Sequence, residues 1–590
     1  MATTGILRSR RSVAQWHALA GVEREIRAND SSGASKYVRD FRDAYRSYQK
    51  VLTAAALRSQ IAAAEVVLVG DYHALPNSQR FLASLLRDPA LDQRPLALGV
   101  ETIFARDQHI LDEWQRREID ECELRQRIRF DSDWGYDWAP FYELLSSARD
   151  RQAAIYGLDC MPREDLRKIA ARDRHAADKI VEIRRSRPDT LLLVLFGESH
   201  LAPQHLPACL AQRLNEQPAG TNSSRRSLLT VLQNVDALYW RAAGEACERI
   251  EAVEVRDRVL CAFNATPLEK YENYRLYLER WRRDDDCGAD LRPTFYNLIE
   301  GLVRFLGIDQ YSPHNSTQPK LLVDSMPEVY ARSSDALLRR LLSRSGFTVS
   351  ARRALLQRVR ERGSIYLAPL NAVYVREFRM TSAAECAARF LHHACRGLPW
   401  RGLPHRGLSP RCVTTRKGHK PLRSPLSPED LFYMAAFEHA LAFFGSRVLH
   451  PARPAFRDPD LAEMYDLTRE DLEQQTGLSF ADAVEVLDLV TALRAFDRAR
   501  GPAQRRDSAR RNATTKDAVA SSNLARSLAL TGRKYECLAE QLGSLAGNDL
   551  YDAYVQGRLT PAALRKLFLA HIDESGAARE QYRQLTTRLR

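Results

Sequence analysis

Short runs of apolar residues alternate with amphipathic segments over the first half of the chain. The clearest runs are residues 66–70, 96–101, 153–159, 191–197 and 227–234. Each run ends near a glycine or an acidic residue. Unbroken runs rich in leucine and β-branched residues are typical of strands buried on both faces, and the segments between them are long enough for helices. We therefore predict an α/β fold with a mainly parallel sheet flanked by helices, and we expect residues 258–265 to add a sixth strand.

The pattern changes several times along the chain. Residues 267–283 start with a proline and keep an apolar and aromatic stripe, which predicts a long helix. From residue 427 onward the amphipathic pattern is almost entirely helical, so we expect a large helical C-terminal region. These changes divide the chain into a helical N-terminal leader (1–60), an α/β domain (61–290), a mixed α/β extension (291–397), a basic proline-rich linker (398–426) and a helical C-terminal domain (427–590).

The composition excludes several classes of protein. Hydrophobic residues make up 45% and charged residues 28% of the 590 residues, and no apolar stretch approaches the ~20 residues of a membrane span. The net charge of +13 comes from arginines mixed closely with acidic residues, so there is no strong nucleic-acid signal. The ten cysteines form no CxxC pair and are expected to be reduced thiols. Because the N-terminus shows no convincing signal peptide or lipobox, we predict a cytoplasmic location.

Reactive side chains directly follow the predicted strands. The first strand runs into Gly-Asp-Tyr-His at 70–73, and the fourth runs into Gly-Glu-Ser-His at 197–200. Glu101 ends the strand between them in sequence. Because the carboxyl ends of parallel strands meet at one edge of a sheet, we expect His73, Glu101 and His200 to lie together.

Two histidines and a carboxylate with an open position form a known arrangement for first-row metals, which activates a bound water. In that arrangement Glu101 is a ligand or a base, and Asp71 and Glu198 accept hydrogen bonds or pair with a metal or an arginine. Tyr72 offers a phenolic oxygen for ferric iron. The alternative is structural: both histidines cap their helices and bind loop carbonyls.

Four segments together resemble one known family. They are VVLVGDYHALPNSQRFLASLL, LALGVETIFARDQHILDEW, WAPFYELLSSAR and LFGESHL, within residues 61–265. These segments are similar to the ChaN-like haem-binding uptake proteins, in the larger group that includes the Tiki and TraB proteins and the erythromycin esterases.

The resemblance implies an α/β fold in which two GxxH motifs and a glutamate share one pocket. By motif, the residues carried over are His73, Glu101 and His200, with Asp71 standing where many members have glutamate. Arg172 and Asp173 resemble the RD helix of the group, for which the implied role is to orient the pocket. Some members are associated with haem or iron uptake, Tiki proteins with metal-dependent peptide cleavage, and the esterases with histidine-assisted attack by water.

Three interpretations follow. The leading one is a ChaN-like protein that binds haem or another iron or first-row metal cofactor at the strand ends, with His73 and His200 as ligand candidates. The second is a metal-dependent hydrolase, a peptidase or an esterase, that uses the same residues on a small-molecule or peptide substrate. The third is a scaffold whose helical C-terminal region forms a homodimer or binds a partner protein.

Overall fold

The chain forms two compact units in the computed structural model. The first includes residues 22–284, and the second includes residues 10–21 and 285–590, so the division falls within α1 (Val13–Asn29). The structure describes residues 10–30, 35–161, 169–215, 228–245, 250–282, 289–308, 326–331, 335–344, 349–395, 426–499, 523, 526–530, 532–572 and 574–588.

An eight-stranded sheet forms the centre of the first unit, with the strand order β1-β7-β8-β6-β2-β5-β3-β4. All neighbours are parallel except the pairs that β7 makes with β1 and β8. The strands are β1 (Lys50–Leu52), β2 (Val66–Asp71), β3 (Leu96–Phe104), β4 (Ala154–Asp159), β5 (Leu191–Gly197), β6 (Leu228–Gln233), β7 (Ala252–Arg256) and β8 (Val259–Ala262). The predicted α/β fold with a mainly parallel sheet is confirmed. The short strands β1 and β7 were not predicted, and β1 lies within the leader that was expected to be helical.

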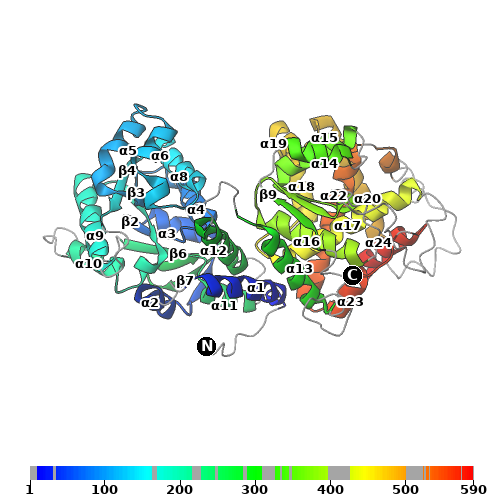
Figure 1. Ribbon diagram of the computed structural model, residues 1–590, viewed down its shortest axis with the longest axis horizontal. Helices are drawn as coiled ribbons and strands as arrows, with labels where there is room; N and C mark the ends of the chain where they lie inside the picture. Colours follow the sequence, from blue (N-terminus) through cyan, green and yellow to red (C-terminus); the bar gives the residue numbers. More distant parts are fainter. Residues whose placement is uncertain are drawn as a thin grey trace. The chain divides into compact units, whose positions relative to one another are not determined.

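Helices cover both faces of this sheet (Figure 1). Successive residues of a strand point to opposite faces, so β2 places Val67 and Val69 in one core cluster and Val66 and Leu68 in the other. One face packs against α3 (Ala54–Ala62), α4 (Pro76–Leu86), α5 (Gln108–Gln115), α6 (Glu121–Arg127), α7 (Phe130–Asp133) and α8 (Trp138–Asp150). The other packs against α2 (Lys36–Ala44), α9 (Ile169–Ser186), α10 (Leu206–Asn215) and α11 (Asp236–Gly244). The unit also contains α12 (Pro267–Arg282) and the short 3-10 helices η2 (Pro89–Leu91), η3 (Ala105–Asp107) and η5 (Glu198–Leu201).

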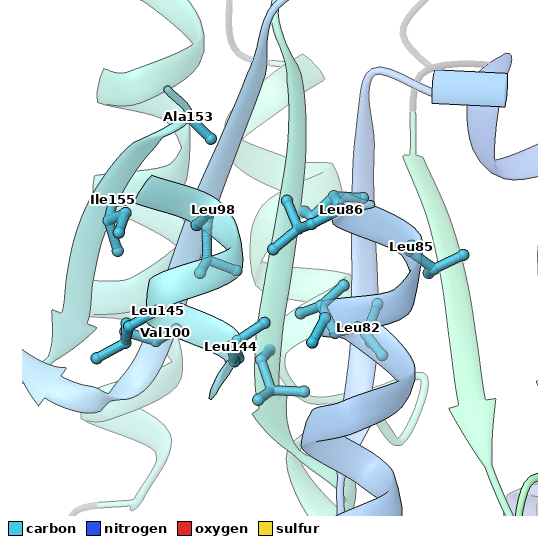
Figure 2. Packing of buried hydrophobic residues seen from close by; sticks show 14 of the residues in the cluster. Leu82, Leu85, Leu86, Leu98, Val100, Leu144, Leu145, Ala153 and Ile155 are labelled. Carbon is cyan, nitrogen blue, oxygen red and sulfur yellow. The ribbon is translucent and has the colours of Figure 1, made fainter. Parts of the chain in front are cut away.

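Leucine side chains of α4 and α8 pack over the middle of the sheet. Figure 2 shows Leu82 and Leu86 of α4 beside Leu144 of α8, with Leu98 of β3 and Ile155 of β4 in the same cluster. All of these side chains are fully or almost fully buried. Burial of a leucine side chain stabilises a fold by ~1.5–3 kcal/mol, so this layer holds the two helices firmly on the sheet.

Two glutamines close the outer edge of β4. The Gln108 side chain donates to Ile155 O at 2.8 Å and accepts from Gly157 N at 3.0 Å. At the other end of α5, Gln115 donates to Ala153 O at 3.0 Å. An edge strand with open backbone groups invites pairing with another chain, and these amides block that pairing.

The second unit is mainly helical and contains a three-stranded sheet of order β10-β11-β9. The run at 364–375, predicted as strand-like, is an antiparallel pair of β10 and β11. The strands are β9 (Glu328–Ala331), β10 (Ser364–Leu367) and β11 (Ala372–Val375). The helices are α13 (Arg292–Leu306), α14 (Asp335–Arg344), α15 (Val349–Arg362), η7 (Ala368–Leu370), α16 (Met380–Cys395), α17 (Pro428–Leu449), α18 (Asp458–Glu463), η8 (Met464–Asp466), α19 (Arg469–Thr476), α20 (Phe480–Ala499), α22 (Gly532–Val555), α23 (Pro561–Phe568) and α24 (Ala577–Arg588). The large helical C-terminal region is confirmed.

Apart from residue 426, the predicted basic linker at 398–426 lies outside the described residues. Among the residues that the structure describes, no helix is both long enough and apolar enough to cross a membrane.

Candidate functional site

The candidate site lies at the carboxyl ends of three adjacent strands, β2, β5 and β3. In the register of the sheet, Asp71 at the end of β2 pairs with Gly197 at the end of β5. On the other side of β5, Val100 of β3 pairs with Leu195, which places Glu101 at the same edge. The topology therefore brings both GxxH motifs and the glutamate together, at the edge where open α/β sheets bind their ligands.

Glu101 lies at the centre of the site and is only 3% exposed. Its Oε1 accepts a hydrogen bond from Arg172 Nη2 at 2.5 Å, and its Oε2 accepts one from Gly197 N at 2.6 Å. His200 Nε2 lies 3.8 Å from Oε1, and His73 Nε2 lies 3.9 Å from Oε2. Burial raises the pKa of the Glu101 carboxyl, but Arg172 and the two histidines outweigh burial and lower it to about 2. Glu101 is therefore a permanent carboxylate and a weak base at neutral pH.

His73 is held by the carboxylate that precedes it in its motif. Its Nδ1 lies 2.7 Å from Asp71 Oδ2, and Gln79 donates to the other oxygen of Asp71. Burial lowers the pKa of the His73 imidazole, but the Asp71 carboxylate outweighs burial and raises it above its ordinary value. The His73 side chain is 22% exposed, whereas that of His200 is 5% exposed. Of the two imidazoles, His73 is therefore the one open to a ligand from solution.

His200 is held by Asp173, 27 residues away in the sequence, with Nδ1 2.5 Å from Asp173 Oδ1. Asp173 and its neighbour Arg172 are adjacent residues of α9, and both are buried. Arg172 also binds Asp159 at the end of β4, through Nε at 2.8 Å and Nη2 at 2.9 Å. The RD pair thus contacts two parts of the site, since Asp173 orients a histidine while Arg172 orients Glu101.

The other two predicted residues, Tyr72 and Glu198, belong to a neighbouring cluster. Glu198 binds the buried Lys270 of α12, whose Nζ lies 3.0 and 3.1 Å from the two carboxylate oxygens. The same Nζ lies 4.4 Å from the centre of the Tyr72 ring. Burial, with nearby Tyr271 and Glu198, raises the pKa of the Tyr72 phenol well above 10, so the phenol stays protonated. These residues join the two motif loops to α12, and the structure does not bring them to Glu101.

Aromatic rings lie beside the imidazole of His73. The centres of the Trp134 and Tyr136 rings lie 4.5 and 5.2 Å from the centre of the imidazole. Tyr136 in turn stacks on Tyr277 of α12, with ring centres 4.2 Å apart and planes inclined by 14°. The approach to His73 is therefore bordered by flat, largely apolar surfaces.

The metal centre predicted at His73, Glu101 and His200 stays a prediction. Both oxygens of Glu101 already accept hydrogen bonds, one of them from the guanidinium of Arg172. Within the described ranges, no group of three or more His, Cys, Asp or Glu side chains is arranged to hold a metal ion.

Sequence reasoning missed Tyr37 and Lys270 as parts of this edge. Lys270 lies on the helix predicted at 267–283, but its partner Glu198 is 72 residues away. Tyr37 lies in the predicted leader, 136 residues from its partner Asp173. Nothing local marks either residue, because each acts through a contact that only the folded chain creates.

The match to a protein-family model lies in the first unit. Residues 57–190 match the family described as "Haem-binding uptake, Tiki superfamily, ChaN". No curated protein sequence matches the chain significantly.

Three solved structures resemble parts of the chain. ChaN of Campylobacter jejuni, described by its cofacial haem binding, is 14% identical over 32% of this chain and 88% of that one, with a TM-score of 0.24. The type III effector HopBA1 is 14% identical over 35% of this chain and 91% of its own, with a TM-score of 0.25. The Pasteurella multocida toxin, described by a thiol-protease-like triad in its C-terminal region, is 12% identical over 37% of this chain and 30% of its own, with a TM-score of 0.23. By its family model, the stretch 57–190 of the first unit is therefore similar to the ChaN haem-binding uptake family of the Tiki superfamily.

Proposed function

We propose that the first unit binds haem at the carboxyl edge of its sheet, against His73 and the aromatic rings beside it. The family of residues 57–190 supports this proposal. The observation that carries it is the partly exposed His73 imidazole, flanked by Trp134 and Tyr136. Aromatic walls suit a flat macrocycle, and an imidazole is a common ligand of haem iron.

The surroundings of His73 suit a haem ligand in a second way. Asp71 accepts from Nδ1, which fixes the ring and leaves Nε2 as the ligand atom, as in many metal-binding histidines. Haem when bound supplies an iron that takes up a nitrogen ligand. The protein itself would hold His73 in place and would exclude water from the site with Trp134, Tyr136 and Tyr277.

The test is a titration of the full chain with haemin, followed by visible absorbance. His73→Ala removes the proposed ligand, and His109→Ala is the matched control, because His109 is an exposed histidine on α5 of the same unit. We expect saturable binding by the wild type and by His109→Ala, and at least a tenfold weaker affinity for His73→Ala. Equal binding by all three proteins would exclude His73 as the ligand, and no saturable binding by the wild type would exclude the haem proposal.

A hydrolase is the second candidate, and one observation favours it. Both imidazoles are held by aspartates through Nδ1 and turn Nε2 toward one buried centre, an arrangement suited to acid–base chemistry on an ester or a peptide bond. Because the pKa of Glu101 is about 2, proton transfer would fall to the histidines rather than to Glu101. Turnover of ester or peptide substrates, measured with and without a chelator, tests both this function and its dependence on metal. The idea fails if His200→Gln turns over as fast as the wild type.

The remaining expectations concern the whole chain. We infer a cytoplasmic location, which cell fractionation tests. The second unit is proposed to form a homodimer or to bind a partner protein, and the mass of the purified chain in solution tests the homodimer.

A further inference from the structure

A hydroxyl from α2 reaches into the candidate site from outside the residues of the family match, 57–190. Tyr37 Oη donates to Asp173 Oδ2 at 2.8 Å, while Asp173 Oδ1 accepts from Nδ1 of His200 at 2.5 Å. Tyr37, Asp173 and His200 are all buried. The three side chains form a continuous row that ends at Nε2 of His200, 3.8 Å from Glu101.

The Tyr37 ring is itself held on its flat side. It stacks on His205, with ring centres 3.7 Å apart and planes inclined by 8°, and His205 Nε2 lies 3.1 Å from Asp40 of the same α2 helix. Tyr45, which follows α2, donates from its hydroxyl to Leu201 O at 2.6 Å, within the turn that carries the second motif. The stack and these two polar contacts hold α2 against the loop of His200, so the position of the Tyr37 hydroxyl is not free to change.

The hydrogen bonds at Asp173 determine which nitrogen of His200 carries the proton. An ionised carboxylate only accepts hydrogen bonds, so Nδ1 must donate to it. If the Asp173 carboxylate rotated away from Nδ1, this preference for a proton on Nδ1 would be lost. The Tyr37 hydroxyl holds the second oxygen of Asp173 in place. A neutral His200 then keeps its proton on Nδ1 and presents the lone pair of Nε2 to the centre of the site.

We propose that Tyr37 is a positioning residue of the site, and that α2 is part of the binding domain although it lies outside the matched residues. Through Asp173, Tyr37 sets the tautomer and the orientation of His200. The inference rests on the proposed function only in taking the cluster around Glu101 as the ligand site.

The experiment compares Tyr37→Phe with Tyr48→Phe in the full chain. Tyr37→Phe keeps the ring on His205 and removes only the hydroxyl. Tyr48→Phe removes a hydroxyl that binds Glu245 in the same unit, away from the site. The readout is the ¹⁵N spectrum of histidine-labelled protein at alkaline pH, in which the two ring nitrogens report the tautomer, and His200→Gln identifies the His200 signals.

We expect Nδ1–H for His200 in the wild type and in Tyr48→Phe. In Tyr37→Phe the ratio of the Nε2–H to the Nδ1–H form should rise about fivefold, the effect of one hydrogen bond. An unchanged ratio in a folded Tyr37→Phe protein would overturn the inference. If that variant does not fold, His205→Gln removes the stacked ring and should shift the ratio in the same direction, and an unchanged ratio there also overturns it.

Haemin affinity separates the inference from the proposed function. Because His73 is the proposed haem ligand, we expect Tyr37→Phe and Tyr48→Phe to bind haemin as the wild type does. If the wild type does not bind haemin, the proposed function fails but the tautomer of His200 still tests the inference. If haemin binds and the tautomer is unchanged in Tyr37→Phe, the inference alone fails.

Discussion

Replacing Arg172 with methionine is the sharpest test of how the site is held together. The guanidinium binds Glu101 and Asp159, and the side chains of all three residues are at most 7% exposed. Arg172→Met keeps much of the apolar volume but leaves two buried carboxylates without this cation. Breaking a buried ion pair from one side typically costs ~3–5 kcal/mol.

The lowered pKa of Glu101 shows how strongly its surroundings favour the ionised carboxylate. A shift of the carboxyl pKa from its ordinary 4.5 to about 2 corresponds to ~3 kcal/mol in favour of the ionised form. Arg172 is the largest of the favourable contributions to that shift. We therefore expect the free energy of unfolding of the first unit to fall by ~3–5 kcal/mol.

The assay is urea unfolding at pH 7, followed by tryptophan fluorescence, because Trp114, Trp134 and Trp138 are buried in the first unit. Arg125→Met is the control, since Arg125 and Asp131 form a 2.7 Å ion pair whose side chains are 42% and 66% exposed. Loss of such an exposed pair costs at most ~1 kcal/mol. A loss of stability in Arg172→Met no greater than in Arg125→Met would refute the reasoning.

The pH dependence gives an independent check. The folded-state pKa of Glu101 is depressed, so its stabilisation is present above pH 4.5 and is lost as the pH falls toward about 2. We expect the wild type to lose ~3 kcal/mol from this group across that window. Arg172→Met should lose clearly less, because its carboxyl no longer has the cation that lowers the pKa. Parallel pH curves for the two proteins would contradict this account.

Three further predictions concern the carboxyl edge of the sheet and its edge strand β4. A methyl group at Gly197 would lie 3.1 to 3.3 Å from the three converging side chains, so Gly197→Ala should weaken haemin binding at least tenfold in the titration above; unchanged affinity would place the ligand elsewhere. Asp71 raises the pKa of His73, so the contribution of His73 to stability is full below pH 6.5 and is lost as the pH rises through the folded-state pKa. The free energy of unfolding should therefore fall between pH 6 and 9, and His73→Gln should abolish this fall. A fall that persists in the variant would assign it to another group. Gln108→Leu should speed hydrogen exchange at the Gly157 amide, which loses its 3.0 Å partner, and unchanged exchange would show that the glutamine does not protect the edge.

The reactive residues at the strand ends were predictable, since parallel strands bring their carboxyl ends to one edge. The sequence therefore predicts that His73, Glu101 and His200 lie together. In the structure, Nε2 of each histidine lies within 4 Å of a carboxylate oxygen of Glu101. The sequence did not predict that Glu101 accepts hydrogen bonds from Arg172 and from a backbone amide. Those contacts depend on where α9 packs, and no local pattern reports that.

Hydrophobic patterning by itself determined six of the eight strands of the large sheet, its mainly parallel order and the edge that carries the chemistry. It could do so because a strand buried on both faces leaves an unbroken apolar run, a property of neighbouring residues. Only the tertiary structure decided the partners within that edge: His200 with Asp173, Lys270 with Glu198, and Tyr37 with Asp173. Each of these pairs joins residues far apart in the sequence, so its geometry is set by the packing of helices on the sheet, and the packing is set by the whole core.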